Sequence, residues 1–108
     1  MAYKSIIAMV KPDLTDRVVN SAKQVGATGA TTIPASGTGA HEAKTFFGLS
    51  LDVRTDVILF LVESEMVEVV LSAIKEAGKF SEPGTGIAFV LAVELTVGFE
   101  SQSSKQEL

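Results

Sequence analysis

The stretch PGTGIAFVLAV, residues 83–93, decides the fold of this chain. Its second part, residues 87–93, is an unbroken apolar run of branched and aromatic side chains bounded by a glycine turn and a glutamate. Such a run is typical of a strand that is buried on both faces. The turn before it, Gly84-Thr85-Gly86, offers successive backbone N–H groups with little side-chain bulk, from which an anion-binding concavity can be built. The sequence therefore predicts a core strand with a candidate binding turn at its start.

Length and composition indicate one small globular domain. The chain has 108 residues and a formal net charge of −4, which argues against nucleic-acid and anionic-membrane partners. We expect residues 1–100 to form the domain and residues 101–108, which have little to bury, to be a disordered tail. The absence of cysteine excludes disulfides, iron–sulfur clusters and thiolate metal sites. The apolar stretch 6–10 is too short for a signal peptide, so we expect a cytoplasmic protein without membrane insertion.

Hydrophobic periodicity predicts four strands and two helices. The strand candidates are residues 3–10, 27–35, 57–62 and 87–93, and a helix with an apolar stripe follows the first and the third of them. We expect Asp13 or Thr15 to cap the first helix and Ser64 to cap the second. Gly26 and Gly78 stand where the two helices should end. The order of elements predicts an α+β ferredoxin-like sandwich, βαββαβ, with two right-handed crossovers.

The last strand is expected to need a cover. In this fold it lies at an edge of the sheet, and a long apolar edge strand promotes aggregation unless something packs on it. A homo-oligomer would supply the cover. Alternatively, residues 94–100 fold back as a short edge strand and cover it within one chain.

Residues 36–56 connect two predicted strands and are far longer than a usual hairpin connection. Phe46 and Phe47 would be exposed in a free loop, so we expect the loop to pack on the body or on a neighbouring subunit. Its first half carries the second glycine triplet, Gly37-Thr38-Gly39. This triplet is either a simple turn or, together with the triplet at 84–86, part of a phosphate site.

His41, the only histidine, lies in the same loop beside Glu42. The pair would give a metal ion two ligands without a nearby third. His41 is otherwise a donor to a ligand phosphate or carboxylate, or a solvated surface histidine. Because no nucleophile, base and orienting acid can be assembled around it, we expect no enzymatic activity.

Several short motifs, in this order, resemble the PII nitrogen-regulatory superfamily in its short-loop, PII-like branch. They are Lys11-Pro12, residues 25–29 (VGATG), Gly37-Thr38-Gly39, residues 78–80 (GKF) and Gly84-Thr85-Gly86. The resemblance spans residues 3–98 and implies a trimeric, PII-like ferredoxin fold. It also implies a non-enzymatic signalling protein that binds an adenine nucleotide (AMP, ADP or ATP) as an effector between subunits, needs no cofactor, and regulates a membrane transporter or an enzyme.

The resemblance also implies roles for individual residues. Gly37 and Gly39 would line the base and ribose, Thr31 would touch the adenine, and Met9 would pack on it. Gly84, Thr85 and Gly86 would hold phosphates. Thr38 and His41 complete the set of candidate ligand-binding residues as further polar donors.

The chain departs from the family pattern where phosphates are held. Family members that bind ATP carry a lysine after the second glycine turn and two arginines on the C-terminal segment, and this chain has Ile87, Gly98 and Glu100 there. Thr55 stands where the family has the lysine that senses 2-oxoglutarate. We therefore expect ATP to lose its usual advantage and 2-oxoglutarate not to be sensed in the usual way. The alternative function is a divalent-cation-binding trimer of related ferredoxin-like architecture.

Overall fold

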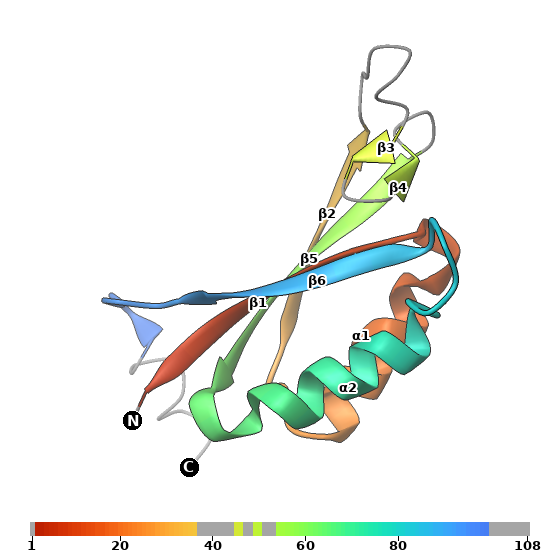
Figure 1. Ribbon diagram of the computed structural model, residues 1–108. Coiled ribbons are helices and arrows are strands. Elements are labelled where there is room, and N and C mark those ends of the chain that lie inside the picture. The colour runs from red at the N-terminus through yellow and green to blue at the C-terminus, as the bar shows by residue number, and fades with distance from the viewer. Residues whose placement is uncertain (1, 37–44, 47–48, 51–53, 100–108) are drawn as a thin grey trace.

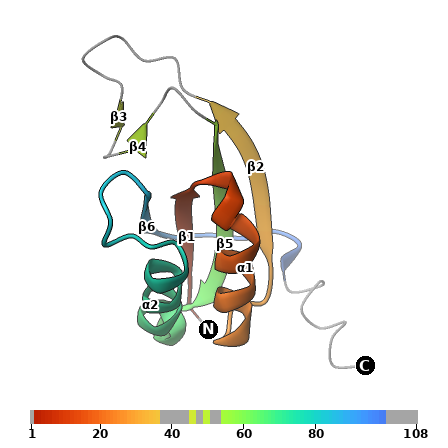
Figure 2. The ribbon, with the colours of Figure 1, turned by 90° about the vertical axis from the view of Figure 1, so that its right-hand side faces the viewer.

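In the computed structural model, the described residues are 2–36, 45–46, 49–50 and 54–99. Two helices, α1 and α2, cover one face of a four-stranded sheet and leave the other face open (Figures 1 and 2). In chain order the main elements are β1 (Tyr3–Val10), α1 (Thr15–Gln24), β2 (Ala30–Ser36), β5 (Arg54–Glu63), α2 (Val67–Ala77) and β6 (Gly86–Ala92). Two short strands, β3 (Thr45–Phe46) and β4 (Leu49–Ser50), pair with each other between β2 and β5.

The sheet confirms the predicted ferredoxin-like fold. Its strand order is β2-β5-β1-β6, and every neighbouring pair is antiparallel. The two central strands, β1 and β5, are therefore the first and third of the four strands that the sequence predicts. The last strand, β6, lies at an edge as expected, and β2 lies at the opposite edge.

Alternation along the central strands divides apolar side chains between the two faces. On the helix-covered face, β1 and β5 contribute fully or almost fully buried side chains at Ile6, Ala8, Val10, Ile58, Phe60 and Val62. Buried residues of the two helices, Val18, Ala22, Val70 and Ile74, complete this core. The open face carries the alternate residues, which are only half-buried in one chain although most of them are apolar.

The predicted side-chain caps at the helix starts are wrong. Neither helix has a side-chain cap, because a 3-10 turn precedes each of them: η1 (Pro12–Leu14) and η3 (Ser64–Met66). In η1 the first free donor is satisfied within the backbone, since Leu14 N donates to Lys11 O at 2.8 Å. The Thr15 hydroxyl instead donates to Asp56 Oδ2 at 2.6 Å, and the Ser64 hydroxyl has no partner among the described residues.

Several predicted boundaries shift. β2 begins at Ala30 rather than at 27 because Ala27 N still donates to Ala22 O and so belongs to the end of α1. β5 extends beyond 57–62 at both ends, and β6 begins and ends one residue earlier than predicted. Residues 94–99 form no strand, so they do not cover β6 within one chain. The predicted tail at 101–108 and most of the predicted packed loop lie outside the described residues.

Candidate functional site

The turn that carries Gly84, Thr85 and Gly86 begins where α2 ends. Phe80 N donates to Lys75 O and Lys79 N donates to Glu76 O, which is the hydrogen-bond pattern of a Schellman motif. Gly78 ends the helix as expected, but its φ is −85° and the left-handed position falls on Lys79, with φ 59°. The chain therefore leaves the helix through a lysine in a conformation that usually requires glycine.

Two glycines make room for the ring of Phe80. A Cβ at Gly78 would overlap the Phe80 ring, and a Cβ at Gly86 would lie 2.5 Å from the same ring and 2.5 Å from the carbonyl oxygen of Met9. Gly86 is also the first residue of β6 and pairs with Val10 of β1. Its lack of a side chain is thus required by close packing of the turn on the sheet.

Thr85 holds the turn closed from inside. Its side chain is almost fully buried, and its Oγ1 lies 2.5 Å from the carbonyl oxygen of Lys79 and 2.9 Å from that of Glu82. The hydroxyl has one proton to donate, so the two carbonyls share it. The N–H groups of Gly84 and Thr85 donate to no other described residue. The turn therefore keeps two unused backbone donors, while the Thr85 hydroxyl serves its internal structure.

The sheet register places this turn relative to the second glycine triplet. Pro34, Asp56, Val10 and Gly86 form one row across all four strands. The end of β2, from which the chain enters residues 37–39, thus lies at the same end of the sheet as the glycine turn. The two lie on opposite edges, and three strand spacings make the separation across the sheet roughly 14 Å. A ligand of nucleotide size would meet both segments most directly where one edge faces the opposite edge of another copy.

The other predicted site residues divide into two groups. Met9 is half-buried on the open face beside the turn, where it pairs with Val57 and Ile87. Thr31 is exposed on β2 and points to the same face, two rows farther along the sheet than Met9. The structure thus brings Met9 next to the turn but places Thr31 on the far edge strand. Gly37, Thr38, Gly39 and His41 lie outside the described residues.

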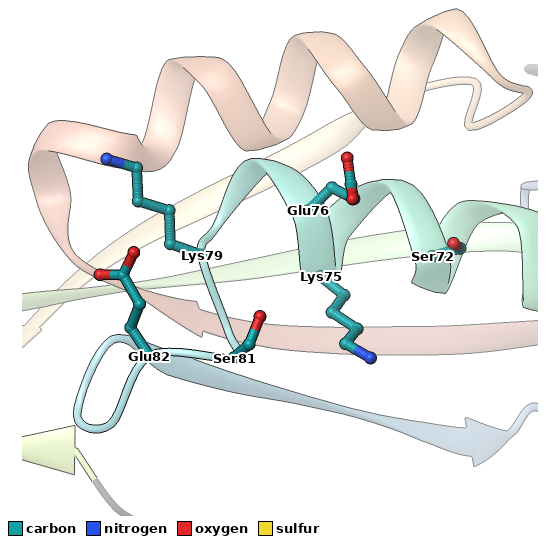
Figure 3. A pocket seen from close by; sticks show the side chains of 6 residues that line it. All are labelled: Ser72, Lys75, Glu76, Lys79, Ser81 and Glu82. Atoms are coloured by element: carbon teal, nitrogen blue, oxygen red, sulfur yellow. The ribbon is translucent and has the colours of Figure 1, made fainter.

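A polar recess beside the turn was not predicted. Figure 3 shows its lining, in which the lysine side chains point in different directions rather than toward one point: Ser72, Lys75, Glu76, Lys79, Ser81 and Glu82. Its volume is about 330 Å³. The C-terminal end of a helix carries partial negative charge, which two lysines offset, and two glutamates add further negative charge. The recess therefore does not select an anion by itself, although Lys79 brings a cation close to the turn.

A second hollow lies on the open face, at the end of β5. It has a volume of about 510 Å³ and is lined by Leu61 and by residues of the segment after β6: Thr96, Val97, Gly98 and Phe99. The Phe99 ring packs edge-on against Tyr3 with ring centroids 4.7 Å apart. The alternation of residues 94–97 suggests an extended segment, but nothing in the sequence indicates where it docks.

The described residues offer neither a cluster of metal ligands nor a helix that could span a membrane. No group of three or more His, Cys, Asp or Glu side chains in this part of the chain is placed to hold a metal ion. No helix in the ranges that the structure describes is long and apolar enough to cross a membrane.

Comparisons with known proteins agree with the fold. The family model of the nitrogen regulatory protein P-II matches residues 3–102 of the chain. The crystal structure of Arabidopsis thaliana PII bound to citrate is similar, with a TM-score of 0.72 and 24% sequence identity over 93% of this chain and 85% of that chain. No curated protein matches the chain in a sequence comparison.

Proposed function

Since the chain belongs to the nitrogen regulatory protein P-II family, we propose that it is a non-enzymatic regulatory protein that binds a small anionic effector between the subunits of a homotrimer. The effector would be an adenine nucleotide. Its phosphates would lie at the turn of Gly84, Thr85 and Gly86, and its base and ribose at residues 37–39 of the neighbouring subunit. Binding would change the loop after β2 and so alter the activity of a membrane transporter or an enzyme.

The observation that carries this proposal is the row Pro34, Asp56, Val10 and Gly86. It puts the glycine turn and the segment leading to the second glycine triplet at one end of the sheet, on opposite edges. Copies arranged around a threefold axis with unlike edges facing each other would bring the two segments together. The half-buried apolar side chains on the open face of the sheet give such an assembly a surface to bury.

The donors at the turn favour a nucleotide with few phosphates. The N–H groups of Gly84 and Thr85 carry no net charge, so they can donate to a phosphate oxygen but do not neutralise the charge of each further phosphate as a lysine or arginine would. Ile87, where ATP-binding relatives are expected to carry lysine, is an apolar residue on the open face. Each additional phosphate would therefore add charge that these positions do not neutralise. AMP or ADP should bind as tightly as ATP or more tightly.

Calorimetry of the full chain with AMP, ADP, ATP, citrate and 2-oxoglutarate tests the proposal. Citrate is included because the Arabidopsis PII structure holds it. We expect micromolar or weaker binding of AMP and ADP, with ATP no tighter. ATP binding at least tenfold more tightly than AMP and ADP would contradict the proposed preference. Absence of binding by all three nucleotides would contradict the proposed effector.

A further inference from the structure

The turn between α2 and β6 is fixed before any ligand arrives. At one end Lys79 is held in the left-handed region by the Schellman hydrogen bonds, and at the other Gly86 is clamped between the Phe80 ring and the Met9 carbonyl. Between these ends, the backbone is closed by the Glu82 N to Lys79 O hydrogen bond of 2.9 Å. Residues 83–85 make no other backbone hydrogen bond to a described residue. Their conformation therefore depends on side chains.

Thr85 is the one side chain of the turn that bonds to the backbone at two points. Its hydroxyl joins the carbonyl of Lys79, at the start of the turn, to that of Glu82, in the middle. Because the same residue supplies one of the two unused N–H groups, locking its side chain also fixes the direction of that N–H. The neighbouring Gly84, with φ 77°, places the second unused N–H on the adjacent peptide. Consecutive free N–H groups on a fixed backbone are the arrangement that binds an oxyanion.

We propose that Thr85 is a positioning residue for phosphate: its hydroxyl stays inside the turn and sets the N–H groups of Gly84 and Thr85 to receive a phosphate oxygen. This inference rests on the proposed function, which places phosphates at this turn. In this inference the Thr85 hydroxyl donates to the backbone carbonyls of the turn and not to the ligand. Binding then depends on the shape of the turn, and the phosphate meets backbone donors only.

A positioning role for the Thr85 hydroxyl and a general contribution to stability predict different effects on ligand binding. A preset turn reduces the ordering required when phosphate binds, but it does nothing for the base or ribose. Loss of the Thr85 hydroxyl should therefore weaken ligands that carry phosphate and leave adenosine unaffected. A merely structural role would weaken adenosine and AMP by the same factor.

The experiment uses ¹⁵N-labelled full-length protein titrated with sodium pyrophosphate, AMP and adenosine, followed by the amide signals. The variants are Thr85→Val, which keeps the shape but removes the hydroxyl, and Thr85→Ser, which keeps the hydroxyl. Thr28→Val, at an exposed threonine between α1 and β2, is the matched control. All titrations are made well below the lowest melting temperature.

In the wild type we expect the amide signals of Gly84 and Thr85 to move with pyrophosphate and with AMP. Thr85→Val should weaken both ligands about tenfold or more, since loss of even one charge-assisted hydrogen bond has that effect. The affinity for adenosine should stay within about twofold of the wild-type value, a difference too small to indicate coupling between the hydroxyl and the base or ribose. Thr85→Ser and Thr28→Val should resemble the wild type.

Equal affinities of wild type and Thr85→Val for AMP would overturn the inference, as would an equal loss for AMP and adenosine. If AMP binds without moving the signals of Gly84 and Thr85, the proposed function stands and the inference fails. If only pyrophosphate binds, at these amides and dependent on Thr85, the inference stands and the nucleotide proposal fails. If Thr85→Val does not fold, the exchange rate of the Thr85 hydroxyl proton in the wild type is the test. The inference requires that this proton stay protected from exchange when pyrophosphate binds. A hydroxyl that instead donates its hydrogen bond to the ligand contradicts the inference.

Discussion

At the scale of single residues, Lys79 is in a conformation that its side chain disfavours. An L-residue in the left-handed region costs roughly 1–2 kcal/mol relative to glycine, and glycine loses about 0.5–1 kcal/mol more entropy on folding. We therefore predict that Lys79→Gly raises the free energy of unfolding by about 0.5–1 kcal/mol, because φ is 59° at this position. Urea denaturation of the variant measures it.

The matched control for this prediction is Lys75→Gly. Lys75 lies in the last turn of α2 and lines the same recess, so the charge removed is comparable. Its backbone is helical, and glycine there should lower the free energy of unfolding by about 1 kcal/mol. Opposite signs for the two variants attribute the gain to backbone conformation. A loss of stability in both would show that the Lys79 side chain makes a stabilising contact.

Gly86 gives the second prediction at this scale. Gly86→Ala would place a Cβ 2.5 Å from the Met9 carbonyl oxygen, a backbone atom that has little freedom to move. Overpacking of this kind costs typically 1–3 kcal/mol, and thermal unfolding should show a corresponding fall in melting temperature. Gly29→Ala is the control because a Cβ there meets nothing within 4 Å. A neutral Gly86→Ala would mean that the turn can retreat from β1.

The glycines of the chain show how much of a local site the sequence can predict. A glycine after an apolar helical stripe predicts a helix end, and Gly26, with φ 132°, confirms that reasoning for α1. At the end of α2 the same reasoning selects Gly78, whose missing side chain serves the Phe80 ring instead. In the triplet at 84–86, Gly84 and Thr85 keep free N–H groups while Gly86 makes room for the Phe80 ring, and the sequence pattern does not distinguish these roles. Packing across the chain decides which glycine serves the backbone and which makes room for a neighbour.

At the scale of elements, periodicity predicted the type and order of all four long strands and both helices. It failed at the element ends, because the 3-10 turns η1 and η3 satisfy donors that side-chain caps were expected to satisfy. Residues 94–99 do not form the covering edge strand that was the alternative for residues 94–100, and within the described part of the chain β6 pairs with β1 alone. An alternating pattern indicates that one face will be covered, but the covering surface can belong to another chain.

The two faces of β6 should respond differently to charge. Val90 points toward the helices and packs against the buried core, whereas Phe89 pairs with Ile7 on the open face. We predict that Val90→Lys lowers the free energy of unfolding by several kcal/mol, because the ammonium group would enter an apolar layer. Phe89→Lys should leave the isolated fold largely intact and act on assembly. Circular dichroism melts of the two variants, made at low protein concentration, measure the difference; equal losses would contradict the assignment of faces.

At the scale of the whole molecule, two apolar side chains of the C-terminal arm, residues 93–99, are not covered by any described residue. Leu95 is 91% exposed and Val97 is 100% exposed, and two positions apart they share one side of an extended segment. Figure 1 shows the segment after β6 continuing outward past the end of the sheet. The contact of Phe99 with Tyr3 fixes the end of the arm relative to the start of β1. An arm and a sheet face are different surfaces, and a contact between unlike surfaces generates a ring of copies where the rotation between them closes.

We therefore predict that the arm anchors the proposed trimer. Leu95→Asp and Val97→Asp should each convert the protein to a monomer at micromolar concentration, since burial of a Leu or Val side chain contributes roughly 1.5–3 kcal/mol and a carboxylate in its place opposes assembly. Helix content should remain that of the wild type, because neither side chain touches the core. Val69→Asp is the control: Val69 is a 45% exposed apolar residue on α2, on the side of the molecule away from the open sheet face. Light scattering distinguishes the outcomes, and trimeric arm variants would show that the open face alone holds the subunits together.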